Sequence, residues 1–343
     1  MDPYVLVVSG AGASCLLGED EDMPQMSGWA RSLAVALDTK EHRLAELLGL
    51  NEDLRGDEFE RRLGEFFTVQ KTFDRLDKFK TLGGPQPMVT KGNLEEWLDT
   101  ARGRSRLILT TIRENLFESF GYNQFSDAKC TAAYTALMSI LGDSGLRMHV
   151  ATTNYDQTVE IALGNMGLAY EDGFIGSGPV TPRLAPDGLV DRANAADRIA
   201  LLHLHGAVGW YELGGEIRKH PSDSPLNSSL GTPAILPPDD TKAVNAFAPW
   251  TRDLWQEFAQ LVQEASHVLV IGHSLNDSHL VDELRKAPGP VAVCAYFSAP
   301  NWDVDAAELG RIYELLPSAS AIPMSFGPDL ETDEKKLRDF LVS

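Results

Sequence analysis

The stretch that decides the fold is Thr152-Thr153-Asn154-Tyr155-Asp156, near the middle of the chain. The apolar residues of 148–152 predict a buried strand, and the pattern of 156–163 predicts a helix. A buried strand that passes through a short polar turn into a helix is the unit from which α/β sheets are built. The polar side chains of this turn therefore stand where a strand ends, which is where such sheets place ligands.

Two further strands end in turns of the same kind. The strand predicted over 4–9 leads into a glycine turn that begins at Gly10, and the strand predicted over 199–204 leads into His205 and Gly206. An Asn, an Asp and a His at strand ends, opposite a loop able to hold phosphate, indicate chemistry on a nucleotide.

The C-terminal half of the chain continues this alternation. Strands are predicted over 268–271, 291–297 and 322–325, and helices over 247–266, about 277–286, 303–315 and 329–341. Strands that alternate with helices predict a parallel sheet covered by helices on both faces. The segments 173–197 and 221–238, rich in turn-forming residues, are predicted to be irregular.

A helical pattern fills the segment between the first two strands. From Gly28 to about Phe120, apolar residues recur at three- and four-residue spacing while charged residues fill the other faces, with a loop at 83–87. We predict a single domain over 1–343, with a sheet-bearing core of about 1–20 and 145–343. A helical small lobe of about 24–130 is inserted into that core.

The composition is typical of a globular protein in a reducing compartment. Of the 343 residues, 43% are hydrophobic, and no apolar run approaches the roughly 20 residues that cross a bilayer. The N-terminus lacks a signal-peptide pattern, and the three cysteines form no CxxC pair that would indicate a zinc ribbon or a disulfide framework. We therefore expect a cytoplasmic protein that does not bind membranes.

The charge of the chain argues against nucleic-acid partners. With 30 Lys and Arg against 50 Asp and Glu, the formal net charge is -20. Such a field repels phosphate backbones, so we expect no direct nucleic-acid partner. The acidity itself is that of a well-solvated surface.

The glycine turn Gly10-Ala11-Gly12-Ala13-Ser14 would let the main chain approach a diphosphate. The alternative is a tight strand–helix turn without a ligand, because Cys15 stands where a dinucleotide fingerprint has its third glycine. The acidic run 19–22 follows closely and would be unfavourable beside a phosphate. We expect it to project into solvent or to form a mobile flap.

Asn154 and Asp156 each allow two interpretations. The amide of Asn154 pairs a donor with an acceptor and can hold a water or a ribose hydroxyl, or it is only a turn residue. Asp156 can cap the following helix, or it can stabilise positive charge that develops on a ribose.

His203 and His205 stand two residues apart, and in a strand such side chains face the same side. Two histidines at this spacing could bind a metal, but no third ligand is evident, so no metal is predicted. His205, next to Gly206, is the candidate general base. His203 is predicted to be a hydrogen-bonded packing residue.

A further glycine turn begins at Gly272. Ser274 in this turn could bind a phosphate or a ribose at the carboxyl edge of the sheet. Asp277 could also contact the ligand, or it could be only the cap of the next helix. Ser298 and Asn301, after the following strand, are candidates for the adenosine side.

Taken together, these motifs resemble the sirtuin-like superfamily, and within it the bacterial NAD-consuming branch. The resemblance spans about residues 5–300 and rests on four motifs in order: Gly10-Ala11-Gly12-x-Ser14, Thr153-Asn154-Tyr155-Asp156, Leu204-His205-Gly206 and Gly272-x-Ser274-Leu275-x-Asp277. It implies a Rossmann-like sheet, NAD bound in the cleft as the substrate, and cleavage of the nicotinamide–ribose bond.

The resemblance also implies roles for the matched residues. Gly10, Ala11, Gly12 and Ser14 would hold the phosphates of NAD. The further residues that we predict to bind NAD are Thr153, Gly272, Ser274 and Asp277. Asn154 and Asp156 would surround the nicotinamide ribose, and His205 would be the catalytic histidine.

The chain departs from the deacylating sirtuins in two ways. Those enzymes carry a four-cysteine zinc module, which three cysteines cannot build. They also follow the glycine turn with a Gly-Ile-Pro-Asp-Phe-Arg-like segment, which 23–29 replaces here without the arginine. A peptide groove is therefore not expected, and water becomes the expected acceptor.

We therefore expect an NAD glycohydrolase that yields nicotinamide and ADP-ribose. Asn154 would position the water or the ribose diol, His205 would accept a proton, and Asp156 would offset positive charge. Two alternatives stay open: an NAD-dependent protein deacylase, and a sensor that binds NAD or ADP-ribose without cleaving it. The resemblance further implies anti-phage defence by NAD depletion, in a homo-oligomer with or without a separate ATPase or sensor partner.

Overall fold

The computed structural model describes residues 3–15, 17–18, 26–41, 44–50, 58–59, 61–63, 65–66, 69, 93–121, 124–176, 181–220, 232–236, 249–295, 297–298, 303–304 and 306–343. Several segments singled out in the sequence lie outside these described residues. They are the acidic run 19–22, the segment 23–25, the loop 83–87 and Asn301.

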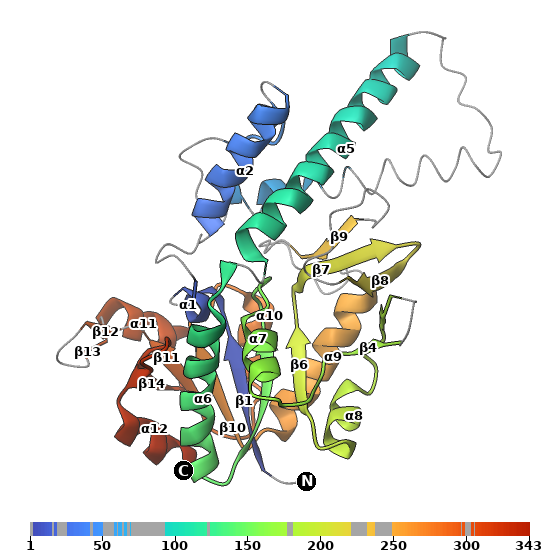
Figure 1. Cartoon of the computed structure of the whole chain (residues 1–343). Coiled ribbons are helices and arrows are strands. Elements are labelled where there is room, and N and C mark those ends of the chain that lie inside the picture. The colour runs from blue at the N-terminus through green and yellow to red at the C-terminus, as the bar shows by residue number, and fades with distance from the viewer. Residues whose placement is uncertain are drawn as a thin grey trace.

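The centre of the molecule is an eight-stranded sheet with the order β15-β14-β11-β10-β1-β2-β6-β3 (Figure 1). Its strands are β1 (Tyr4–Ser9), β2 (Arg147–Thr152), β3 (Tyr170–Glu171), β6 (Ile199–His203), β10 (His267–Ile271), β11 (Val291–Ala295), β14 (Ser320–Ser325) and β15 (Glu331–Thr332). Every neighbouring pair is parallel except β14 and β15. The predicted parallel sheet is confirmed, with one correction: β15 is antiparallel, because the short segment 326–330 cannot make a crossover.

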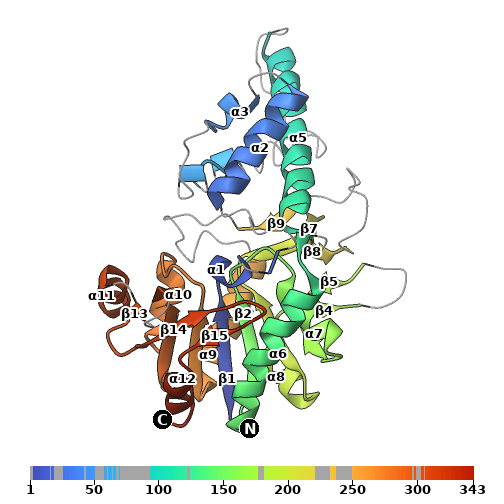
Figure 2. The same ribbon diagram turned by 60° about the vertical axis from the view of Figure 1, so that its left-hand side comes forward.

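Helices cover both faces of this sheet, as predicted (Figures 1 and 2). One face packs against α8 (Leu189–Ala195), α9 (Pro249–Glu264), α10 (Ser278–Leu284) and α11 (Ala306–Leu315). The other face packs against α6 (Asp127–Asp143), α7 (Thr158–Asn165) and α12 (Glu334–Leu341). Within β6, Leu202 belongs to the first core and Leu201 to the second, because successive strand residues point to opposite faces.

The order of the strands reverses beside β1. The chain runs from β1 outward through β2 and β6, and then crosses back to build β10, β11 and β14 on the other side of β1. Open α/β sheets bind ligands at the carboxyl ends of the strands at such a reversal. The fold therefore directs attention to the turns after β1, β2, β6 and β10.

A second sheet was not predicted from the sequence. It is antiparallel, with the order β4-β5-β8-β7-β9. Its strands are β4 (Phe174–Ile175), β5 (Arg183–Leu184), β7 (Gly206–Leu213), β8 (Glu216–Lys219) and β9 (Thr232–Ile235). A two-stranded ribbon of β12 (Phe297–Ser298) and β13 (Asp303–Val304) completes the strands of the described residues.

The prediction that 173–197 and 221–238 are irregular is wrong in part. The first segment contains β4, β5 and α8, and the second contains β9. Helix α8 follows Gly188, whose φ is +69° and which offers no side-chain cap. Its first N–H groups are instead bound by Glu257 of α9, which accepts from Gly188 N at 2.7 Å and from Val190 N at 2.8 Å. A cap from a distant helix leaves no local sequence signal.

The helical lobe stands beyond the carboxyl edge of the main sheet (Figures 1 and 2). Its described helices are α2 (Met26–Lys40), α3 (Leu44–Leu47) and α5 (Asn93–Phe120). Trp29 packs edge-on against Phe59 and Phe120 at 5.0 and 5.4 Å between ring centroids. The same core includes Tyr155 from the turn after β2, so the lobe packs directly on that turn.

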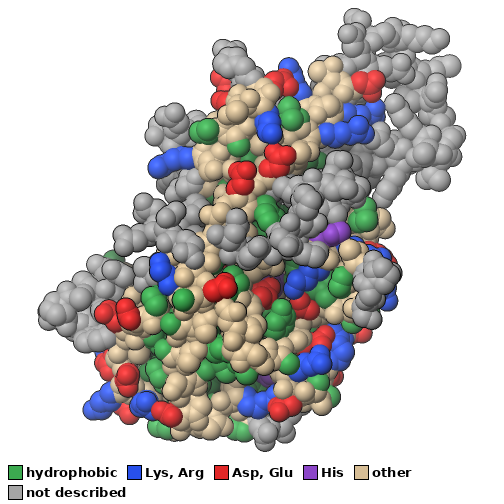
Figure 3. Space-filling model, in the orientation of Figure 1, with side chains coloured by type: hydrophobic (Ala, Val, Ile, Leu, Met, Phe, Trp, Pro, Cys, Tyr) green, Lys and Arg blue, Asp and Glu red, His purple; other side chains and the backbone are tan. Residues whose placement is uncertain are grey.

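The surface drawn in Figure 3 carries both signs of charge. Lys and Arg side chains of the described residues lie dispersed among Asp and Glu on this face, with no single basic field. Across the described parts of the chain, no helix is both long enough and apolar enough to traverse a bilayer.

Candidate functional site

Four strands of the main sheet end in one row. Ser9 of β1 is in register with Ile271 of β10 on one side and with Thr152 of β2 on the other. Thr152 is in turn in register with His203 of β6. The turns that follow these residues therefore emerge at the same level, at the carboxyl edge of the sheet.

Asn154 joins the turn after β2 to the turn after β1. Its Nδ2 donates to the carbonyl of Gly10 at 3.0 Å and to the hydroxyl of Ser14 at 2.9 Å. Both the donor and the acceptor of this amide were expected to hold a ligand, but the donor is used within the protein. No described residue donates to Oδ1, so this oxygen is the atom that Asn154 offers to a ligand hydroxyl or a water.

Asp156 is buried at the start of α7. Its Oδ1 accepts from the main-chain N–H of Thr158 at 3.1 Å and from the hydroxyl of Thr158 at 2.7 Å, so it organises the first turn of the helix. Burial raises the pKa of Asp156, although hydrogen bonds from Thr158 and Ser14 act against that rise. Asp156 therefore binds the first N–H of α7, as expected if it caps this helix.

The glycine turns after β1 and β10 are packed main chain against main chain. A Cβ at Gly272 would come within 2.1 Å of Ala13 N, and one at Gly10 within 2.7 Å of the carbonyl oxygen of Gly272. Gly272 also has φ at +62°, a left-handed conformation that favours glycine. These glycines are thus required by the approach of two loops, whether or not a ligand is present.

The same packing occupies two N–H groups of the first turn. Gly10 N donates to Ile271 O at 2.9 Å and Gly12 N to Gly272 O at 2.8 Å. The α1 segment (Ala11–Ser14) follows, in which Ala11 and Gly12 are exposed and Ser14 is buried. Only the exposed part of this turn can meet a phosphate directly, while Ser14 holds Asn154.

His205 is paired with Asp277. Its Nε2 donates to Asp277 Oδ2 at 2.9 Å, and both side chains are 5% exposed. The other carboxylate oxygen of Asp277 accepts from His279 N at 3.0 Å and Leu280 N at 3.3 Å, which caps α10. The predicted cap is confirmed, and the same carboxylate also holds the histidine.

The expectation that His203 and His205 face the same side is wrong. Strand β6 ends at His203, and Gly206, at φ +76°, turns the chain into β7. His203 bonds to Glu160 of α7, whereas His205 bonds to Asp277 at the start of α10, and these helices cover opposite faces of the sheet. The turn between the two histidines therefore separates their surroundings.

Gly206 serves the packing of the second sheet. A Cβ on it would lie 1.9 Å from the carbonyl oxygen of Ala234 in β9. The carbonyl of His205 accepts from Leu236 N at 2.8 Å, just past the end of that strand. The His-Gly pair of the sequence thus marks where the second sheet begins.

The loop between Gly272 and Asp277 is held in an unusual shape. Leu275 has φ at +55°, which is uncommon for a residue with a side chain, and its N–H donates to Nδ1 of His273 at 2.8 Å. Arg311 of α11 donates to the carbonyl of Ser274. Such strained loops persist where surrounding contacts impose them, and they recur at functional sites. The Ser274 side chain itself is exposed.

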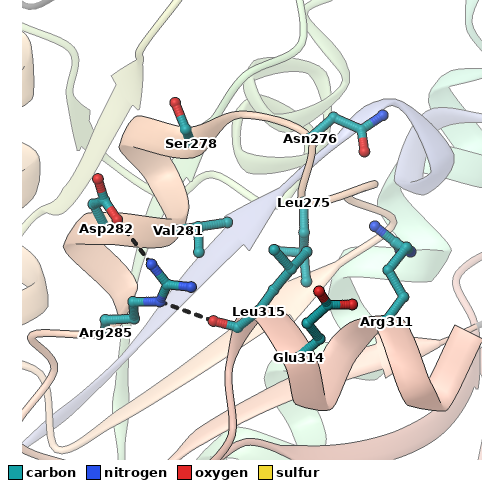
Figure 4. A pocket seen from close by; sticks show the side chains of 9 residues that line it. All are labelled: Leu275, Asn276, Ser278, Val281, Asp282, Arg285, Arg311, Glu314 and Leu315. Carbon is teal, nitrogen blue, oxygen red and sulfur yellow. Dashed lines mark hydrogen bonds and ion pairs between the residues drawn. The ribbon is translucent and has the colours of Figure 1, made fainter.

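A cavity of about 350 Å³ lies between α10 and α11 (Figure 4). It is lined by Leu275, Asn276, Ser278, Val281, Asp282, Arg285, Arg311, Glu314 and Leu315. Arg285 in its wall is already bound, to Asp282 at 3.0 Å and to the carbonyl of Leu315 at 2.9 Å. Neither Asn154 nor His205 lines it, whereas Leu275 and Asn276 belong to the loop after β10, so the cavity adjoins the row of strand ends on the α11 side.

The remaining predicted residues are placed as follows. Thr153 is half-buried, and its N–H donates to Ser9 O at 3.1 Å. Ser298 lies in β12. Among the described residues, no group of three or more His, Cys, Asp or Glu is arranged to hold a metal ion.

Sequence reasoning missed three contributors to this edge. Glu160 binds His203 at 3.0 Å, Arg311 holds the Gly272 loop, and Tyr155 donates its hydroxyl to Leu236 O at 2.6 Å. Each pairing joins residues far apart in the chain, so no local motif marks it. Of the three, only Tyr155 could have been suspected from the sequence, because it lies between the predicted site residues Asn154 and Asp156.

Part of the chain that forms this edge is similar in sequence to a known protein family. Residues 148–288 match the family model described as a SIR2-like domain. The match contains Asn154, Asp156, His205 and Asp277, and it begins after the glycine turn of β1. No curated protein sequence matches the chain significantly.

Proposed function

Because residues 148–288 form a SIR2-like domain, a type of domain that uses NAD, we propose that this chain is an NAD glycohydrolase. It would cleave the bond between nicotinamide and ribose and pass the ribose to water. A role in bacterial anti-phage defence by NAD depletion is part of the proposal, as is assembly into a homo-oligomer with or without a separate partner. These last elements rest on the family resemblance.

One observation carries the proposed chemistry. Asn154 and the His205–Asp277 pair are fixed at the ends of strands that terminate in one row, beside the reversal of strand order. An acceptor oxygen and an oriented imidazole at that edge are what water activation requires. The exposed Ala11 and Gly12 of the neighbouring turn suit the diphosphate of the same substrate.

The pairing with Asp277 sets the role of each nitrogen of His205. When Nε2 carries the proton that is donated to Asp277, the lone pair of the neutral ring lies on Nδ1. The carboxylate then stabilises the imidazolium that forms. Asp277 therefore acts through His205, in addition to capping α10.

The reaction follows from these assignments. The C–N bond between ribose C1′ and nicotinamide breaks, and its electron pair leaves with nicotinamide, which departs neutral. Water, held by Oδ1 of Asn154, attacks C1′ and loses its proton to Nδ1 of His205. The products are nicotinamide, ADP-ribose and one proton. The carboxylate of Asp156 would offset the positive charge that develops on the ribose.

The direct test is to incubate the purified chain with NAD and separate the products by chromatography. We expect equal amounts of nicotinamide and ADP-ribose from the wild type. The variant Asn154→Ala should lose about 100- to 10,000-fold in kcat, since it removes both the water ligand and the tie to the β1 turn. Turnover of this variant at the wild-type rate would contradict the mechanism.

The matched control is Asn115→Ala. Asn115 is also buried and also donates through Nδ2, to the hydroxyl of Ser32 at 2.8 Å, but it lies on α5. This control should cleave NAD at the wild-type rate. Intact NAD recovered from a tight complex would indicate the sensor alternative, and NAD consumption only with an acylated peptide would indicate a deacylase.

A further inference from the structure

His203 belongs to a buried polar network behind the proposed water site. Its side chain is 1% exposed. Its Nε2 lies 3.0 Å from Oε1 of Glu160, and its Nδ1 lies 3.4 Å from the main-chain carbonyl of Asn154. The ring also packs edge-on against Trp210, with 5.6 Å between centroids. Both ring nitrogens thus face oxygen atoms that can only accept hydrogen bonds.

Two acceptors around one imidazole decide its protonation. A neutral ring with its proton on Nδ1 would point the lone pair of Nε2 at the carboxylate of Glu160. A neutral ring with its proton on Nε2 would point the lone pair of Nδ1 at the carbonyl of Asn154. The imidazolium alone donates to both. The two contacts, at 3.0 Å and 3.4 Å, therefore favour a charged His203.

The surrounding charges agree with this state. Burial acts to lower the pKa of His203, but Glu160 outweighs it and raises that pKa above its usual range. Burial likewise acts to raise the pKa of Glu160, yet His203 and Lys219 hold it below its usual range. Lys219 lies 4.0 Å from Glu160 Oε1 and 2.7 Å from Asp172, so its own charge is partnered.

The remaining charged neighbour is Asp156, which faces His203 from the start of α7. The charge of His203 lowers the pKa of Asp156, against the larger effect of burial. Tyr170 lies beyond Lys219, whose Nζ is 6.0 Å from its ring centroid. The network thus pairs its cations with carboxylates and leaves no charge alone within the described residues around His203.

We propose that His203, held as an imidazolium by Glu160, is a positioning residue that fixes the carbonyl of Asn154 and so aims the Asn154 amide at the substrate. This inference rests on the proposed function. The N–H of Asn154 is bound by Thr152 Oγ1 at 3.0 Å and its side chain by the β1 turn. His203 adds a third contact, at the main-chain carbonyl, and leaves only Oδ1 of the side chain directed at the substrate.

Two substitutions separate positioning from mere stability. In His203→Asn, the new Nδ2 occupies the place of Nδ1 and can still donate to the carbonyl of Asn154, while Glu160 loses its hydrogen-bond donor and keeps only Lys219, at 4.0 Å. In His203→Gln, the new Nε2 occupies the place of the ring Nε2 and can still donate to Glu160, while the carbonyl loses its donor. An unpaired buried carboxylate costs more stability than an unpaired carbonyl.

The positioning role therefore predicts opposite orders for activity and stability. We expect kcat for NAD cleavage to fall about 10- to 100-fold in His203→Gln, with KM changed less than about threefold, because small misplacements mainly affect the chemical step. The kcat of His203→Asn should be about tenfold higher than that of His203→Gln, although its Tm is lower. If kcat follows Tm across the two variants, the inference is wrong.

A second measurement does not depend on activity. The full chain is labelled with ¹⁵N-histidine, and the resonances absent from His203→Asn are assigned to His203. In a titration from pH 5 to 9, both its ring nitrogens should stay protonated past the pH at which an ordinary imidazole loses its proton. A ring that loses its second proton at or below that pH overturns the inference. A wild-type chain that releases no nicotinamide contradicts the proposed function instead, and the spectrum still decides whether His203 makes both bonds.

Discussion

Two histidine–carboxylate pairs flank the turn after β2, and they do different things. His205 with Asp277 lies at the start of α10, whereas His203 with Glu160 lies against α7, on the other face of the sheet. In the first pair the carboxylate sets which nitrogen accepts a proton. In the second both nitrogens are engaged by acceptors, so the imidazole has none to offer to a substrate. Under the two proposals, the same two residue types give a base in one place and a fixed cation in the other.

The largest expected effect comes from the first pair. His205→Ala should lower kcat for NAD cleavage by about 100- to 10,000-fold, because it removes the general base. The check is steady-state release of nicotinamide, with circular dichroism to confirm the fold. His267→Ala, a buried histidine of β10 that packs on Phe340, is the control and should retain wild-type kcat. An equal loss of kcat in both variants would show that His205 has no special role in catalysis.

A smaller loss of kcat is expected when Asp277, the partner of His205, is changed. Asp277→Asn can still cap α10 but no longer fixes the tautomer of His205, so kcat should fall about 10- to 100-fold. The matched control is Asp333→Asn, since Asp333 caps α12 in the same way, accepting from Lys336 N at 3.1 Å, and lies outside the candidate site. Both variants should melt close to the wild type. A loss of kcat in Asp333→Asn, or none in Asp277→Asn, would contradict the assigned role.

The smallest expected effect is on stability, and it concerns the second pair. The lowered pKa of Glu160 contributes stability above about pH 4.3, which is lost as pH falls through the folded pKa. The raised pKa of His203 contributes stability that is complete below about pH 6.5 and is lost as pH rises through the folded pKa. The pair should therefore stabilise the fold most between about pH 4.5 and 6.5.

The measurement is the free energy of unfolding in urea for wild type and Glu160→Gln at several pH values from 5 to 9. The difference should be largest near pH 5.5 and shrink toward pH 9, by about 1.4 kcal/mol for each pKa unit involved. Asp197→Asn is the control, because Asp197 pairs with Arg147 while 89% exposed, and exposed pairs contribute little. If the difference in the free energy of unfolding grows as the pH rises, His203 is not charged in the folded protein.

The strand ends could be predicted because each combines an apolar run with a polar or glycine turn. The turns at Gly10, Asn154, His205 and Gly272 all lie at the carboxyl edge of the main sheet, as expected from parallel strands. The roles of the glycines could not be predicted, because Gly10 and Gly272 are explained by contact with each other. A sequence pattern does not reveal which backbone a glycine faces.

Partners from distant segments account for what was missed. The spacing of His203 and His205 favours one shared face only while the strand continues, and the strand ends at His203. Asp277 is recognisable as a cap, but its second partner lies 72 residues away. Glu257 similarly starts α8 from a different helix. Pairings of this kind are set by tertiary packing, so only the folded chain reveals them.

The interlocked glycine turns also decide which fragments of the chain can form the candidate site. The turn at Gly10 precedes the loop that it packs against, at Gly272, by 262 residues. A nascent or truncated chain that stops before Asp277 lacks both the neighbour of the first turn and the partner of His205. Under the proposed function, such a fragment would not cleave NAD, and cleavage could begin only after Asp277 has been made.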